Sequence, residues 1–170
     1  MKDKIISLFL AVMLLITAFA PLQLTVGALS EIWNGTLSEP KSGSGGSDDP
    51  IKITNAAELA WLVNQTDAST SGRYYKLTTD IMLNDTEAVS GATATPWFAQ
   101  NEAADNTVAF GGHFDGGGHT VSGLYFNDRF NSSQSNMAYY SLAVGLFPRL
   151  GAGAVIENLG ITDSYIKALN

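Results

Sequence analysis

Clusters of glycine separate the short apolar segments in the second half of the chain, and this punctuation limits the fold more than any other feature. Residues 116–118 are three glycines, and Gly151 and Gly153 form a second cluster. The segments that follow, 120–126 and 155–161, share the pattern apolar-x-x-Leu-x-apolar. Short strands that recur with glycine turns are typical of repeated units, which must stack because one unit cannot bury its inner face alone. We therefore expect one dry interior shared by Val121, Leu124, Ile156 and Leu159.

The composition and charge of the chain exclude several classes of protein. Charged residues make up 15% of its 170 residues, below the roughly 25% of an average soluble domain. A coiled coil or a highly charged disordered chain needs far more charge than this. The formal net charge of −7 offers no electrostatic attraction to nucleic acid or to anionic lipid. The length and the glycine content favour one turn-rich β domain with no nucleic-acid partner.

The first 28 residues have the pattern of a secretory signal peptide. A mildly basic start precedes an apolar run over 5–20, and small residues at 26–28 predict cleavage after Ala28, with 18–20 as a second candidate. The run is shorter than the about 20 residues that a spanning helix needs. An uncleaved anchor and a buried helix are therefore the weaker alternatives. We expect a secreted or cell-surface protein whose mature chain has no membrane span.

Two further sequence features concern an exported chain. Cysteine is absent, which excludes disulfides, zinc–thiolate sites and thiol nucleophiles. The pattern Asn-x-Ser/Thr occurs at Asn34, Asn64, Asn84 and Asn131. In a eukaryote this pattern marks glycan acceptors. Cysteine-free export favours a bacterium, where we interpret the four matches as chance in an Asn-rich chain.

The beginning of the mature chain is predicted to be a lead-in followed by a helix. Residues 29–50 form the lead-in and a flexible linker, because their second half is dominated by Ser, Gly and Asp. We expect Trp33 to hold this lead-in against the domain. Asn55 and Glu58 form a capping box, and apolar residues at helical spacing predict one helix over 56–65.

The remaining pattern predicts short strands and two insertions. The segment 51–53 is a strand candidate, and the alternating segments 74–78 and 80–84 have the period of half-buried strands. Polar stretches over 85–105 and 127–141 predict irregular insertions.

Three blocks of the chain, in this order, resemble the GLUG-repeat proteins of bacterial surfaces. Residues 55–62 with 75–83 are similar to the opening helix and first coil of that family. Residues 114–124 are similar to its F-D-G-x-G-H-T-I-x-G-L segment, and residues 145–161 to the GLUG repeat itself. Pro148 and Arg149 depart from the family, in which a glycine follows Gly-Leu-Phe.

The resemblance implies an all-β protein of the pectate-lyase shape, a right-handed parallel β-helix (a solenoid) with an N-terminal capping α-helix. On this basis residues 51–170 hold the cap and the first coils. The resemblance also implies an exported, often adhesin-like protein, and such repeats occur in some immunoglobulin-A-cleaving peptidases. Residues 169–170 follow a coil without an obvious cap, so we expect the N-terminal piece of a longer protein or a truncated product.

The stretch from His113 to His119 is the most site-like cluster of the sequence. His113 and Asp115 point to the same face if this stretch is a strand. Asp80, Asp115 and His119 are the candidate metal ligands or acid–base residues. The alternative, which the resemblance favours, is that the glycines form a turn in which Asp115 and His119 bond to the backbone.

Oxygen-bearing side chains near other turns have two interpretations. Asp80, Asn84 and Asp85 are candidate calcium ligands, although neither an EF-hand nor a calcium repeat is present. Asn158 is expected at a corner, where stacked asparagines satisfy backbone groups. We favour turn roles for all of them, and so expect no cofactor, with calcium as the alternative.

Four aromatic residues lie in or beside the insertions. Exposed aromatic rings can stack on sugar rings, and the alternative is that the rings fold over the flank of the domain. The four candidate binding residues are Trp97, Phe98, Tyr139 and Tyr140.

These observations predict a non-catalytic exported scaffold that binds a glycan or a host protein through its insertions. The alternatives are a polysaccharide-active lyase or hydrolase, and the N-terminal module of a secreted peptidase. No serine-nucleophile, zinc-protease, Walker or dinucleotide motif occurs. Convergence of Asp80, Asp115 and His119 in an outward groove would favour the enzyme, whereas bonding of these residues within turns would favour the scaffold.

Overall fold

The computed structural model describes residues 32–91, 93–97, 109–127 and 145–167. Within these ranges the chain forms nine short strands and three helices. The helices are α2 (Ala56–Val63), α3 (Asp67–Thr70) and α4 (Thr86–Gly91). The strands are β1 (Ile51–Ile53), β2 (Tyr74–Leu77), β3 (Ile81–Met82), β4 (His113–Asp115), β5 (Thr120–Ser122), β6 (Tyr125–Asn127), β7 (Val155–Glu157), β8 (Gly160–Thr162) and β9 (Tyr165–Lys167).

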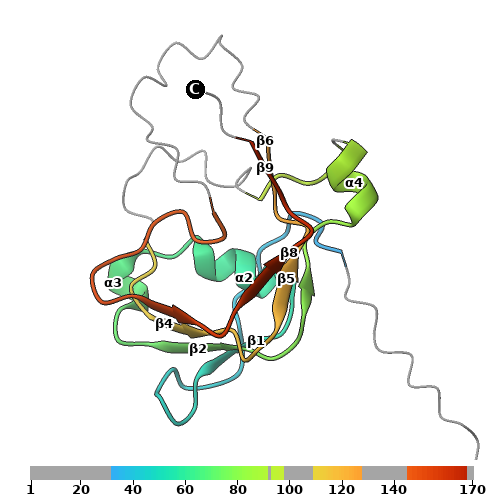
Figure 1. The fold of residues 1–170 in the computed structure, drawn as a ribbon. Helices are drawn as coiled ribbons and strands as arrows, with labels where there is room; N and C mark the ends of the chain where they lie inside the picture. Colours follow the sequence, from blue (N-terminus) through green and yellow to red (C-terminus); the bar gives the residue numbers. More distant parts are fainter. Residues whose placement is uncertain (1–31, 92, 98–108, 128–144, 168–170) are drawn as a thin grey trace, which may run out of the picture.

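The strands form three small sheets in which every pairing is parallel. One sheet has the order β1-β2-β4-β7, a second has the order β3-β5-β8, and β6 pairs with β9. From β2 onward, successive strands along the chain belong to different sheets, so each return of the chain adds a strand beside an earlier one. The first two sheets meet at an angle, and α2 lies in the space between them (Figure 1).

Helix α2 begins where the sequence predicts it. The Asn55 side chain accepts a hydrogen bond from Glu58 N at 3.0 Å, which satisfies a free N–H group of the first turn. The Glu58 carboxylate reaches back to Thr54 N at 2.7 Å, one residue beyond the partner of a standard capping box. The helix ends at Val63, two residues before the predicted end.

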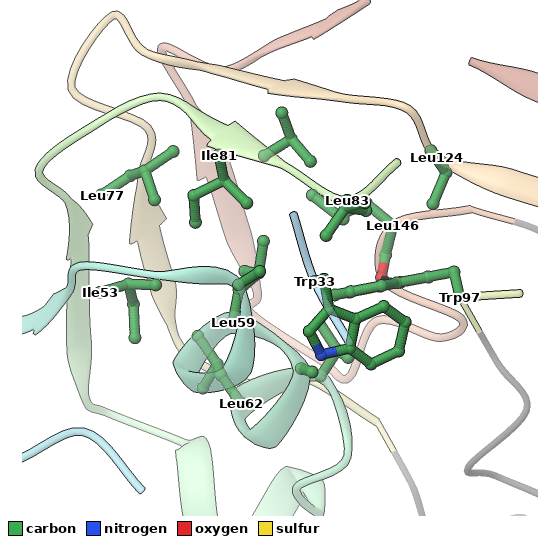
Figure 2. Packing of buried hydrophobic residues seen from close by; sticks show 14 of the residues in the cluster. Trp33, Ile53, Leu59, Leu62, Leu77, Ile81, Leu83, Trp97, Leu124 and Leu146 are labelled. Carbon is green, nitrogen blue, oxygen red and sulfur yellow. Dashed lines mark hydrogen bonds between the residues drawn. The ribbon is translucent and has the colours of Figure 1, made fainter. Parts of the chain in front are cut away.

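The apolar side chains of α2 and of the strands share one interior. Leu59 and Leu62 of α2 are fully buried and point into this cluster (Figure 2). Ile53 pairs with Leu77 across β1 and β2, and both side chains are fully buried. Burying a side chain of this size stabilises a fold by about 1.5–3 kcal/mol. This cluster is therefore the main source of stability of the described residues.

The four residues expected to share an interior do lie in one cluster. Val121 and Leu124 are buried, and Ile156 and Leu159 are partly buried and pack against the same core. The interior is thus confirmed, and its later two members lie at its rim.

Burial decreases toward the last strands of the sheets. Ile81 and Val121 are paired in register and buried, whereas Ile161, which pairs with Val121, is 44% exposed. Val155 of β7 is 41% exposed and Ile166 of β9 is 51% exposed. Among the described residues, β7, β8 and β9 each have a neighbouring strand on one side alone.

The lead-in covers the opposite end of the sheets, as expected for Trp33. Trp33 is 4% exposed and belongs to the core, and its backbone N–H donates to Met82 O at 3.3 Å. Farther along the lead-in, Ser42 O accepts a hydrogen bond from Lys52 N of β1 at 2.9 Å. These contacts satisfy backbone groups on the outer side of the first strands.

The expected all-β class and right-handed parallel β-helix are wrong for this chain. The described residues include three helices, and their strands form separate small sheets rather than a closed or continuous solenoid sheet. The strands stay short because turns interrupt them; β5, for example, ends directly before Gly123, which has a φ of 72°. Helix α2, expected as a cap, contributes buried residues to the core.

The predicted irregular insertion over 85–105 contains a helix in its described part. Helix α4 occupies Thr86–Gly91, and Val89 packs with Ala94 and Tyr125 in a second, smaller apolar cluster. The polar composition of this stretch hid the helix, because its apolar residues are too few to show a helical period. The insertion predicted over 127–141 lies outside the described residues except for Asn127.

The repeat inferred from the sequence is out of register with the structural pairing. The shared pattern of residues 120–126 and 155–161 places Thr120 opposite Val155. In the structure, Thr120 pairs with Gly160, and Val155 pairs with His113. The segment 155–161 therefore spans two strands, β7 and the start of β8, which belong to different sheets.

The close approach of Gly123 to Asn84 gives a test of this packing. Gly123 has a φ of 72°, and a Cβ at this position would overlap the backbone oxygen of Asn84. We expect Gly123→Ala to lower the free energy of unfolding by about 2 kcal/mol, because it adds steric overlap to an unfavourable backbone conformation. Urea titration followed by circular dichroism measures the change.

Gly46→Ala is the matched control for this substitution. Gly46 lacks a positive φ, and the nearest atom to an added Cβ would be Ser44 Oγ at 3.9 Å. We expect its unfolding midpoint to stay within experimental error of the parent. Equal effects of the two substitutions would contradict the close approach at Gly123.

Candidate functional site

The candidate site is the outward side of β2, β4 and β7, called here the polar face and made of Lys76, His113, Asp115 and Glu157. Side chains alternate along a strand, and Phe114 between His113 and Asp115 is fully buried. His113 and Asp115 consequently share the outward side, as the sequence predicts. The parallel pairing places Lys76 and Glu157 on either side of Asp115.

Asp115 is bonded through both carboxylate oxygens. Oδ1 accepts hydrogen bonds from Gly117 N at 2.8 Å and from Asn158 Nδ2 at 3.0 Å, and Oδ2 lies 3.0 Å from Lys76 Nζ. The bond from Asn158, followed by those from Gly117 and Lys76, lowers the pKa of Asp115 to about 2. A carboxylate held ionised in this way is a poor general acid or base near neutral pH, because such a group needs a pKa near the working pH.

His113 is bonded to the neighbouring strand. Its Nε2 lies 2.8 Å from Glu157 Oε1, and its ring lies beside the Tyr74 ring, with centroids 5.1 Å apart. The side chains of His113 and Glu157 are both partly exposed, and they lie on the adjacent strands β4 and β7. These contacts connect β2, β4 and β7 on their outer side.

Asp80 and His119 meet at the turn before β5. Asp80 Oδ1 accepts a hydrogen bond from Thr120 N at 2.8 Å and lies 3.3 Å from His119 Nδ1. The bond from the Thr120 backbone is the main cause that lowers the pKa of Asp80 below its usual value. The Asp80 side chain is 68% exposed, so this contact contributes little to stability.

The predicted metal ligands do not assemble into one site. Asp80 and His119 are brought together, whereas Asp115 bonds to Lys76 and Asn158 instead. Among the described residues, no group of three or more acidic, histidine or cysteine side chains is arranged to hold a metal ion.

The residues considered for calcium are also separated by their contacts. Asn84 is 4% exposed and donates from Nδ2 to Gly123 O at 2.8 Å and to Thr95 O at 3.1 Å. Its Oδ1 accepts from Thr95 N at 2.7 Å. Asp85 Oδ1 accepts from Ala88 N at the start of α4. Asn84 thus satisfies backbone groups inside the fold. This role was expected for Asn158, whose side chain instead donates to Asp115.

Of the four candidate binding aromatics, Trp97 alone lies among the described residues. Trp97 is 3% exposed, packs edge-on against Trp33 with ring centroids 5.0 Å apart, and donates from Nε1 to Leu146 O at 2.8 Å. Figure 2 shows the two indoles side by side at one end of the core. A ring in this position does not reach a sugar, so the surface role predicted for Trp97 is wrong. Phe98, Tyr139 and Tyr140 lie outside the described residues.

Sequence reasoning missed three residues that bond to His113 or Asp115, namely Lys76, Glu157 and Asn158. Asn158 has a φ of 54°, in the left-handed region that asparagine tolerates better than most residues. The alternation in 155–157 indicates that the Glu157 side chain points outward. Placing it beside Asp115 also requires the strand register, which pairs Asp115 with Glu157.

A comparison with known proteins finds a similarity to part of a much longer protein. The chain is 30% identical over 129 residues to halomucin of Haloquadratum walsbyi (strain DSM 16790 / HBSQ001). The match covers 76% of this chain and 1% of halomucin, so the chain corresponds to a very small part of that protein. No family model matches the chain, and no solved structure matches it.

No helix in the described part of the chain combines the length and the apolar character that a membrane crossing needs. The apolar run over 5–20 lies outside the described residues.

The network around Asp115 predicts a pH-dependent contribution to stability. The folded-state pKa of about 2 lies below 3.8, the usual value for an aspartate, so the contribution is complete well above pH 4 and is lost as the pH falls through about 2. We expect Asp115→Asn to lower the free energy of unfolding by about 1 kcal/mol at pH 7. Urea titrations at pH 7 and at pH 2 measure the difference between parent and variant, which should be much smaller at pH 2, where protonation of Asp115 removes most of the contribution.

Asp48→Asn is the control, because Asp48 is exposed in the lead-in. It should change stability by less than the Asp115 variant at pH 7. A difference between the parent and Asp115→Asn that persists unchanged at pH 2 would show that the ionised form of Asp115 is not what stabilises the fold.

Proposed function

We propose that the chain is a module of an exported surface or secreted protein, and that it binds a glycan or a host ligand without catalysing a reaction. The observation that carries this proposal is the bonding of the site-like residues within the fold. Asp115 and Asp80 accept hydrogen bonds from Gly117 N and Thr120 N, which is the arrangement that favours a scaffold. The insertions over 85–105 and 127–141 are the proposed contact regions.

Three observations support an extracellular location. The first 28 residues have the pattern of a cleavable signal. The blocks that resemble GLUG-repeat surface proteins support the same location. The similarity to halomucin is consistent with a surface protein.

The structure offers less support for a polysaccharide-active enzyme. General acid–base cleavage of a glycosidic bond requires two carboxyl groups that are free to exchange protons with the substrate. Asp115 is bonded by Lys76, Gly117 and Asn158 and has a pKa of about 2. The scaffold therefore agrees better with the geometry of the polar face.

Export of the chain is tested with a reporter enzyme that is active only outside the bacterial cytoplasm, fused to the C-terminus of the full chain. We expect reporter activity from the parent. Two arginines in the apolar run, Leu14→Arg with Leu15→Arg, should reduce activity at least tenfold, because charge in this run opposes insertion into the export channel.

Leu37→Arg is the control for export. Leu37 lies in the lead-in and is 44% exposed, so a charge there should leave reporter activity unchanged. Full reporter activity in the double-arginine variant would refute the signal peptide.

The binding role is tested on the exported protein with glycan and extracellular-matrix arrays, alongside a screen for polysaccharide cleavage. We expect binding without cleavage. Asp115→Asn and His119→Gln should leave any binding signal within twofold, because these side chains bond to neighbouring residues of the chain. Cleavage that is lost in either variant would replace the scaffold proposal with an enzyme, and the absence of any array signal would count against a glycan or matrix ligand.

A further inference from the structure

The three described Asn-x-Ser/Thr patterns differ sharply in the availability of the asparagine side chain. Glycosylation uses the side-chain amide nitrogen, so an acceptor asparagine must lie at the surface with this nitrogen accessible. The structure therefore distinguishes patterns that look equivalent in the sequence. Asn131, in the fourth pattern, lies outside the described residues.

Two of the patterns use their amide nitrogen inside the fold. Asn84 is buried, and its Nδ2 donates to two backbone oxygens. Asn64 is partly buried, and its Nδ2 donates to Ala60 O at 2.6 Å at the end of α2. In the folded chain, transfer to either nitrogen would require breaking these hydrogen bonds, and for Asn84 also exposing a buried side chain.

Asn34 has the opposite arrangement. It is exposed, and its side-chain oxygen rather than its nitrogen is engaged, accepting from Thr36 N at 3.1 Å and from Thr36 Oγ1 at 2.7 Å. Among the described residues, its Nδ2 has no hydrogen-bond acceptor. The hydroxyl of the third residue thus bonds to the amide of the first, while the nitrogen faces solvent.

The fold holds this pattern in place on the surface. Trp33, buried in the core directly before it, donates from Nε1 to Thr36 O at 2.8 Å. Gly35, which lies between Asn34 and Thr36, has a φ of 88°, a conformation that glycine adopts without strain. Ile32 and Leu37, which flank the pattern, are 46% and 44% exposed, so apolar surface is available for the less polar face of a sugar ring to cover.

We propose that Asn34 is an N-glycosylation site and that Asn64 and Asn84 are not, so the interpretation as chance is replaced for Asn34 and kept for the other two. This inference rests on the proposed export of the chain. The sugar donor is a lipid-linked oligosaccharide phosphate or pyrophosphate. The bond from sugar C1 to the phosphate oxygen breaks, a bond from C1 to Asn34 Nδ2 forms, the amide nitrogen loses one proton, and the lipid phosphate leaves.

The test has a cellular and a purified arm, both with the full chain. In cells that carry an Asn-x-Ser/Thr oligosaccharyltransferase, peptide mass spectrometry should find glycan on Asn34 with at least tenfold higher occupancy than on Asn64 or Asn84. In the purified arm, the folded chain is incubated with the transferase and a lipid-linked oligosaccharide. The same preference is expected there, whether or not the cells export the chain.

Matched variants separate the acceptor from its surroundings. Asn34→Gln and Thr36→Ala should both abolish the modification at residue 34, Thr36→Ser should retain it, and Asn64→Gln should leave the total glycan mass unchanged. An unmodified Asn34 in the purified arm, or equal occupancy of the three asparagines, would overturn the proposal. Loss of export with modification retained in the purified arm would instead refute the proposed location and leave the acceptor site standing.

Discussion

The described fold depends on the exclusion of water from one interior between α2 and the sheets. Leu59 and Leu62 supply one side of this interior, and the buried strand residues Leu77, Ile81 and Val121 supply the other. Each strand is only two to four residues long, and short strands are marginal when isolated. Their pairing therefore persists because the same residues also bury apolar surface.

Polar groups are arranged around this interior so that few remain unsatisfied where the backbone turns. Asn84 serves two segments at once, because its amide bonds to Thr95 and Gly123. On the outer side, Asp115 connects β2, its own turn and the turn after β7. The aspartates that resemble part of a catalytic cluster in the sequence, Asp80 and Asp115, thus accept hydrogen bonds from groups in turns.

Local features were predictable from the sequence, whereas their placement depended on tertiary contacts. The N-cap at Asn55 and the burial of Trp33 followed from short-range patterns and are present. The overall class was wrong, because a shared apolar period does not state which segments become neighbours; Thr120 pairs with Gly160 rather than with Val155. Helix α4 has too little apolar periodicity to be detected. For the candidate site, the outward orientation of His113 and Asp115 was predictable, but Lys76 and Asn158 became partners of Asp115 only through the strand register.

Burial falls from the strands beside the lead-in to β7, β8 and β9. The free energy of local unfolding should therefore differ between the two sides of the fold. Local unfolding has the lowest free energy where buried apolar contacts are fewest, and the side chains of Val155, Ile161 and Ile166 retain 41–51% of their exposure. Backbone amides in this outermost layer are consequently protected by the smallest opening free energy, and those of α2 and β2 by the largest. Within the described residues, we therefore expect the β7–β9 layer to open before α2 and the strands beside the lead-in.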